Sequence, residues 1–187
     1  MRLFRKSQLE ELPVTMAGVK LGDRLLVAGC GDPRLIASLA VKTGLTGHAC
    51  AVDDSAERSA NAARVAQTEG ALIETITTPL SKLPLEAATF DIVVLRDVLG
   101  DGGTDSPLRV AQEAWRVLRP GGRCLAIESA SRGGLTRLLG SRQSKPADPA
   151  RVMDAFKEAQ FRGVRTLAER EGLLFVEGTK PASSHDG

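Results

Sequence analysis

Apolar runs of the length of a β-strand recur along this chain of 187 residues. The first of them lack alternating polar residues and are separated by segments with helix-like spacing. This pattern is typical of strands that are buried on both faces of a parallel sheet. The runs cover residues 25–28, 49–52, 72–77, 90–95, 124–127, 164–167 and 173–176. They predict a doubly wound α/β fold, with helices on both faces of the sheet.

The last two runs are joined only by residues 168–172, which is too short for a parallel crossover. We therefore predict a mostly parallel seven-stranded sheet that ends in an antiparallel hairpin at one edge. Such a sheet differs from the all-parallel arrangement of a nicotinamide-binding domain. The chain length fits a single domain, residues 1–180, with a mobile polar tail over residues 181–187.

Helical spacing is clearest in residues 55–69, where Asp54 and Glu57 fit a capping box. A second helix is predicted over residues 107–118, with Pro107 in its first turn. A third should begin near residue 148 and end by residue 163.

Charge and composition argue against several classes of protein. The chain has 25 basic and 23 acidic residues, five Phe, one Trp and no Tyr, so we do not expect the basic and aromatic surfaces of a nucleic-acid binder. Its three cysteines are odd in number and widely spaced, which predicts buried thiols and neither disulfides nor a metal site. No signal peptide and no apolar run of about 20 residues is visible, so we expect a cytoplasmic protein without a membrane span.

A glycine turn, Gly29-Cys30-Gly31, follows the first predicted strand and would let the backbone approach a ligand. Asp53 lies about 20 residues further on, where an acid can bind ribose hydroxyls. Because Asp54 is explained as a helix cap, Asp53 is the better ribose ligand. A tight turn without a ligand and a solvated loop carboxylate are the alternatives for these two features.

The dinucleotide fingerprint requires a third glycine where this chain has Arg34, which weakens the nicotinamide hypothesis. Taken together, four blocks resemble the class I S-adenosylmethionine-dependent methyltransferases, especially those of ubiquinone and menaquinone biosynthesis. The blocks are residues 27–31, residues 52–55, residues 83–85 with 89–94, and residues 117–123. The last of these, Val-Leu-Arg-Pro-Gly-Gly-Arg, is expected to be only a helix stop and turn.

The resemblance implies that S-adenosylmethionine is the cofactor, bound at the turn formed by Gly29, Cys30 and Gly31. It further implies methyl transfer to a small-molecule acceptor whose identity the sequence does not give. Two acids usual in the family are missing, because Val27 stands where one helps to hold the methionine end and Pro79 where another meets adenine. Leu80 can still pack on the adenine.

A replacement carboxylate for the methionine ammonium is expected from Asp32 or Asp97, which follow strands at the ligand-binding edge. Arg96 is expected to contact the cofactor or substrate, or else to form an ion pair. Neither His48 nor His185 is placed to act as a general base, so no catalytic residue is assigned.

The missing acids motivate a second hypothesis, a degenerate methyltransferase-fold module for binding or assembly without catalysis. Residues 129–146 contain four cations and several glycines and are predicted to form a mobile basic lid that favours an anionic acceptor. That lid, or a second subunit of a homodimer, would complete the acceptor pocket.

Overall fold

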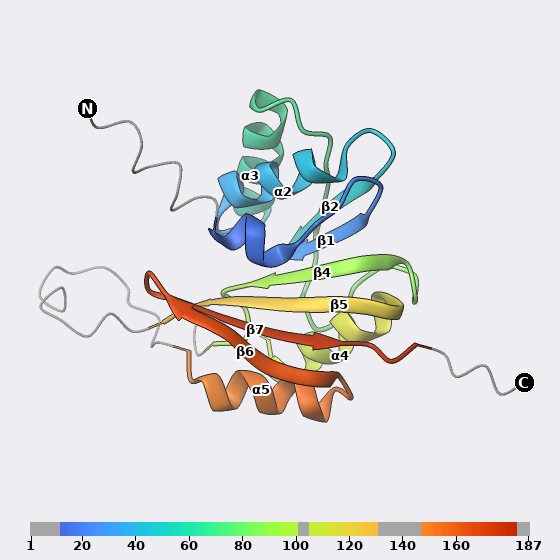
Figure 1. Cartoon of the computed structure of the whole chain (residues 1–187). Coiled ribbons are helices and arrows are strands. Elements are labelled where there is room, and N and C mark those ends of the chain that lie inside the picture. The colour runs from blue at the N-terminus through green and yellow to red at the C-terminus, as the bar shows by residue number, and fades with distance from the viewer. Residues whose placement is uncertain (1–11, 101–104, 131–146, 183–187) are drawn as a thin grey trace, which may run out of the picture.

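The computed structural model describes residues 12–100, 105–130 and 147–182. These residues form a seven-stranded sheet in the order β3-β2-β1-β4-β5-β7-β6 (Figure 1). The strands are β1 (Arg24–Ala28), β2 (His48–Asp53), β3 (Glu74–Thr77), β4 (Phe90–Arg96), β5 (Leu118–Ser129), β6 (Arg162–Arg170) and β7 (Leu173–Thr179). The predicted fold class is confirmed.

Strands β1 to β5 pair in parallel, whereas β7 runs antiparallel between β5 and β6. The predicted hairpin turns at Glu171 and Gly172, whose φ angles of 58° and 78° are both left-handed. That geometry matches the right-handed twist of the flanking strands in a two-residue turn. The connection is shorter than predicted because β6, an edge strand with mostly exposed residues, extends to Arg170.

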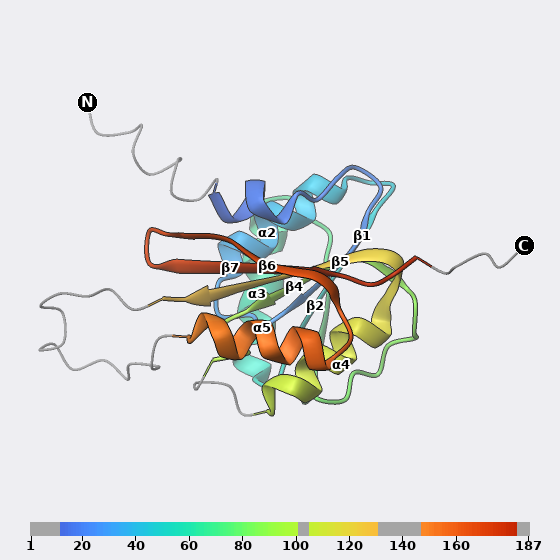
Figure 2. The ribbon, with the colours of Figure 1, turned by 60° about the horizontal axis from the view of Figure 1, so that its bottom comes forward.

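Helices cover both faces of the sheet (Figure 2). One layer consists of α2 (Pro33–Thr43) and α3 (Ala56–Thr68), and the other of α4 (Pro107–Val117) and α5 (Pro149–Glu158). Adjacent residues of β4 serve the two layers, because Val94 belongs to the core under α2 and Val93 to the core under α4. Burial on both sides explains why the sequences of the central strands β1, β2 and β4 lack alternation.

The first turns of α2 and α3 differ from the prediction in two details. The N-cap of α3 is Ser55, whose Oγ accepts a hydrogen bond from the Arg58 N–H at 3.3 Å, so the capping box of Asp54 and Glu57 is wrong. Arg34 is exposed on α2 and does not come between helix and strand, so its bulk gives no packing argument against a dinucleotide.

Residues 119–122 follow α4 directly and lie at the irregular start of β5, where Gly121 has a φ of 79°. The pairing of β4 with β5 shifts register here, between Phe90 and Ile92. Asp91, between them, accepts a hydrogen bond from the Arg24 N–H at 2.6 Å. This block therefore ends the helix as predicted, but it forms the first part of β5 and not a turn before the strand.

A helical segment over residues 12–17 is fastened to the sheet by Arg123, whose guanidinium donates to the carbonyls of Met16 and Ala17 at 2.9 and 2.7 Å. None of the described helices is long and apolar enough to cross a membrane. The four cations of the predicted lid and residues 183–187 of the predicted tail lie outside the described residues.

Candidate cofactor site

A cavity of about 260 Å³ lies at the carboxyl ends of β1, β2 and β4. Strand β1 lies between β2, which follows it along the chain, and β4, which the chain reaches only after β3. The strand order therefore reverses at β1. Ligands of open α/β sheets bind at such a point. The cavity is lined by Gly29, Gly31, Asp53, Asp54, Arg58, Leu80, Arg96, Asp97, Val98 and Asp105.

The two glycines of the turn have different tasks. Gly29 has a φ of 97°, and a Cβ there would overlap the carbonyl of Arg96 and lie 2.8 Å from a methyl of Val98. It is required because the turn packs tightly against the end of β4. At Gly31 nothing lies within 4 Å of an added Cβ, so this residue opens onto the cavity.

Asp53 is 2% exposed and holds the turn in place. Its Oδ2 accepts from the Cys30 N–H at 2.6 Å, and its Oδ1 accepts from the Ser55 N–H at 2.8 Å and from Arg58 Nε at 2.9 Å. Burial opposes ionisation, but the hydrogen bonds from Arg58, Cys30 and Ser55 outweigh it and lower the pKa of Asp53. The premise that Asp53 has no structural task is therefore wrong, although it does line the cavity as expected.

Cys30 and Asp32 both have structural roles, and their part in cofactor binding stays a prediction. The Cys30 N–H is already used by Asp53, and burial raises the pKa of its thiol to about 12, so the side chain is an inert part of the core. Asp32 caps α2 by accepting from the Leu35 N–H at 3.2 Å and is not among the lining residues. Of the two acids expected at the methionine end, only Asp97 faces the cavity.

Arg96 and Asp97 form an ion pair at the end of β4, the alternative that the sequence left open for Arg96. Asp97 has a left-handed φ of 52°, and its carboxylate accepts from the N–H of Ser129 at 2.6 Å and from its Oγ at 3.1 Å. Arg96 donates from Nη1 to the carbonyl of Ile127 at 3.3 Å. Its Nε is buried without a hydrogen-bond partner in the described part of the chain.

Leu80 lines the cavity as predicted and is held there by Asp105. The carboxylate of Asp105 accepts from the N–H of Leu80 at 2.7 Å and from the Oγ of Ser81 at 2.7 Å. An acid therefore stands beside Leu80 even though Pro79 is not acidic.

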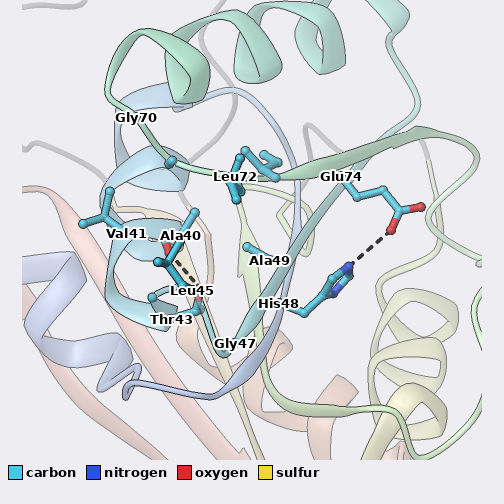
Figure 3. Close-up of a pocket in the computed structure, with 13 residues that line it drawn as sticks. Ala40, Val41, Thr43, Leu45, Gly47, His48, Ala49, Gly70, Leu72 and Glu74 are labelled. Atoms are coloured by element: carbon cyan, nitrogen blue, oxygen red, sulfur yellow. Dashed lines mark hydrogen bonds and ion pairs between the residues drawn. The ribbon is translucent and has the colours of Figure 1, made fainter.

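A second, larger hollow of about 540 Å³ lies at the other end of the sheet, around the amino ends of β2 and β3 (Figure 3). Val41, Leu45 and Leu72 line it with exposed apolar side chains, and His48 lies 3.4 Å from the Glu74 carboxylate at its edge. Despite its size, this hollow contains none of the predicted site residues. His48 is accordingly remote from the cavity at the carboxyl ends.

Comparison with known proteins decides the family. Residues 26–126, more than half of the chain, match the family described as "Methyltransferase domain". The chain belongs to this methyltransferase family. It is 30% identical to the chloroplastic 2-phytyl-1,4-beta-naphthoquinone methyltransferase of Arabidopsis thaliana, over 95% of this chain and 72% of that protein.

Solved structures share the fold of this chain. An S-adenosylmethionine-dependent methyltransferase from Aquifex aeolicus matches with a TM-score of 0.76 at 21% identity, over 95% of each chain. The (4+2)-cyclase SpnF matches with a TM-score of 0.71 at 17% identity, over 94% of this chain and 81% of SpnF. These two likenesses concern the fold. Together with the family match, they identify the chain as an S-adenosylmethionine-dependent methyltransferase.

The residues of this methyltransferase fit its cofactor. Gly31 leaves open space where a Cβ would intrude, the acids Asp53 and Asp54 are among the lining residues, and Leu80 offers an apolar surface. The buried Nε of Arg96 supplies a donor that no described residue uses. A nucleoside with a zwitterionic tail needs this combination of acceptors, apolar surface and donors.

Sequence reasoning missed four residues that line the methyltransferase cavity: Asp54, which was assigned only a capping role, Arg58, Val98 and Asp105. Arg58 bonds to Asp54 at 2.6 Å with the i, i+4 spacing of helical ion pairs, a signal that was available. Asp105 acts on Leu80 across 25 positions, for which the sequence gives no local signal.

Proposed function

We propose that this chain transfers a methyl group from S-adenosylmethionine to a small-molecule acceptor, with the cofactor lying across the cavity at the carboxyl ends of the strands. The observation that carries the proposal is the meeting of Gly31, the carboxylates of Asp53 and Asp54, and Leu80 around one cavity at the switch point of the sheet. Each is the kind of group that one part of the cofactor requires.

Within this proposal, Asp53 binds the ribose hydroxyls and Leu80 packs on the adenine. Arg96 and Asp97 present opposite charges at the end of β4, which complements the carboxylate and the ammonium of the methionine end. Asp97 thereby takes the part of the acid that Val27, buried in β1, does not supply.

The sulfonium of the cofactor supplies an already activated methyl group. The chain must then orient the acceptor in line with that methyl and keep water away, and neither task requires a covalent intermediate. A site without a nearby histidine among the described residues is compatible with this chemistry, since the proposal assigns the chain no proton transfer.

For the acceptor we propose a small aromatic compound, and the naphthoquinone named for the Arabidopsis relative gives the class to test first. The three cysteines are free and buried, which fits a reducing compartment such as the cytoplasm. An anionic acceptor, a lid and a second subunit at the pocket remain predictions.

The function is tested by incubating the chain with S-adenosylmethionine labelled in the methyl group and a panel of reduced naphthoquinones and other small aromatic acceptors. We expect label in one acceptor and release of S-adenosylhomocysteine. Tight binding of S-adenosylhomocysteine without transfer to any acceptor would instead favour the non-catalytic binding module, a role that SpnF makes reasonable by placing a different activity on this fold.

The ribose assignment predicts that Asp53→Asn weakens binding of S-adenosylhomocysteine by roughly 1.5–3 kcal/mol, at least tenfold, because a charge-assisted hydrogen bond is lost. The melting temperature should also fall, since Asp53 holds the turn through Cys30 and Ser55. Calorimetric titration measures the first effect and thermal unfolding the second.

Asp54→Asn is the matched control, because Asp54 is the adjacent carboxylate of the same wall and also pairs with Arg58. It should change the affinity less than threefold. A larger loss with Asp54→Asn than with Asp53→Asn would move the ribose to Asp54.

A further inference from the structure

Glu128 is a buried acid that the proposed function does not use. It lies near the end of β5 and is 2% exposed. Opposite it in the sheet stands the apolar Leu174 of β7. A carboxylate removed from water in this way is costly unless hydrogen bonds compensate it.

Three backbone hydrogen bonds provide that compensation, all from the segment that follows β4. Oε1 of Glu128 accepts from the N–H of Val98 at 3.1 Å and of Leu99 at 3.0 Å, and Oε2 accepts from the N–H of Gly100 at 3.1 Å. Because these three N–H donors face both oxygens of Glu128, each oxygen must accept a hydrogen bond. An ionised carboxylate accepts fully at both oxygens, whereas protonation turns one oxygen into an O–H donor with less acceptor capacity.

The segment held by Glu128 forms a wall of the proposed cofactor cavity. Val98 lines that cavity, and its side chain lies against the glycine turn, close to where a Cβ on Gly29 would stand. The same segment begins with Asp97, which is tied to Ser129, the neighbour of Glu128 in β5. The end of β5 therefore fixes residues 97–100 at consecutive points.

We propose that Glu128, as a carboxylate, is a positioning residue that holds residues 98–100 against the glycine turn and thereby sets the affinity of the cavity for its cofactor. This inference rests on the proposed function, since it concerns the same cavity. Glu128 does not line the cavity and acts only through the segment that it holds.

The surroundings of Glu128 place its ionisation near neutrality. Burial raises its pKa to about 7, the charge of Asp97 adds to this, and the three N–H groups act in the opposite direction. Among the described charged groups at this end of β4, Arg96 directs its guanidinium to Asp97 and to the carbonyl of Ile127. Among the described residues, the register partner of Glu128 in β7 is the apolar Leu174, and the Cβ of Ala147 lies beside Gly100.

The inference predicts that affinity for S-adenosylhomocysteine rises with pH. If the ligand binds well only when Glu128 is ionised, a pKa near 7 gives a dissociation constant about tenfold weaker at pH 6 than at pH 8. Binding at pH 7 should also release protons. Titration calorimetry in buffers of different ionisation enthalpy measures both quantities on the unmodified chain.

Glu128→Gln keeps the shape of the side chain and replaces one acceptor with an amide donor. We expect this variant to bind S-adenosylhomocysteine about tenfold more weakly at pH 8, without dependence on pH and without proton release. His48→Gln is the control, because His48 lies at the opposite end of the sheet. It should retain the full pH dependence.

Constant affinity and no proton release between pH 6 and pH 8 in the unmodified chain would overturn the inference and leave the proposed function intact. Full pH dependence in Glu128→Gln would overturn it as well. The proton-release measurement decides the matter even if Glu128→Gln does not fold. Failure of S-adenosylhomocysteine to bind at any pH would contradict the proposed function itself, and the inference with it.

Discussion

Gly31→Val is expected to abolish binding of S-adenosylhomocysteine while the chain stays folded. An added Cβ at Gly31 meets no atom within 4 Å, so the protein can accommodate a side chain there. The space that it fills is the cavity itself, where the cofactor must approach the backbone. We expect the dissociation constant to rise at least about 100-fold, which corresponds to roughly 2.7 kcal/mol, in a calorimetric titration.

Gly31→Ala serves as the graded control, since it adds one carbon to the same space, and it should reduce the affinity less. Circular dichroism should show that both variants are folded. Unchanged affinity in Gly31→Val would mean that the ligand does not pass this turn.

Gly29→Ala, two positions away, is expected to act on stability and to cost about 3 kcal/mol of the free energy of unfolding. The φ of 97° is strained for any residue with a side chain, at roughly 1–3 kcal/mol. In addition, the new Cβ would overlap the carbonyl of Arg96, and forced packing of this kind costs roughly 1–3 kcal/mol. Denaturation by urea measures the loss.

Gly121→Ala separates the two contributions. Gly121 also has a positive φ, 79°, but an added Cβ there meets nothing within 4 Å. Gly121→Ala should lower the free energy of unfolding only by the cost of the backbone conformation, about 1 kcal/mol. If the two variants lost the same free energy of unfolding, the contact of the turn with the end of β4 would contribute nothing to stability.

The fold could be predicted because its signals are local. Uninterrupted apolar runs marked the parallel strands, and the few residues between the last two runs required the hairpin of β6 and β7. The order of these elements placed the glycine turn at the ligand-binding edge, whereas Leu80 was expected there only from the family resemblance.

What the sequence did not predict depends on conformation and on distant contacts. Asp54 and Ser55 are both good capping residues, and only the extended backbone of Ser55, with a φ of −103°, decides which one caps α3. Asp53 was not recognised as the residue that holds the turn, because its bond to the Cys30 N–H spans 23 positions. The bonds of Asp105 to Leu80 and of Glu128 to Val98 span 25 and 30 positions, and no spacing rule reaches that far.

The central claim, a cofactor-binding methyltransferase cavity at the carboxyl ends of β1, β2 and β4, is tested most directly by titrating S-adenosylhomocysteine into the unmodified chain, with NADH and NADPH titrated in parallel. The account predicts saturable binding of one equivalent of S-adenosylhomocysteine and no binding of either nicotinamide. Saturation by NADH or NADPH with no heat from S-adenosylhomocysteine between pH 6 and pH 8 would contradict it.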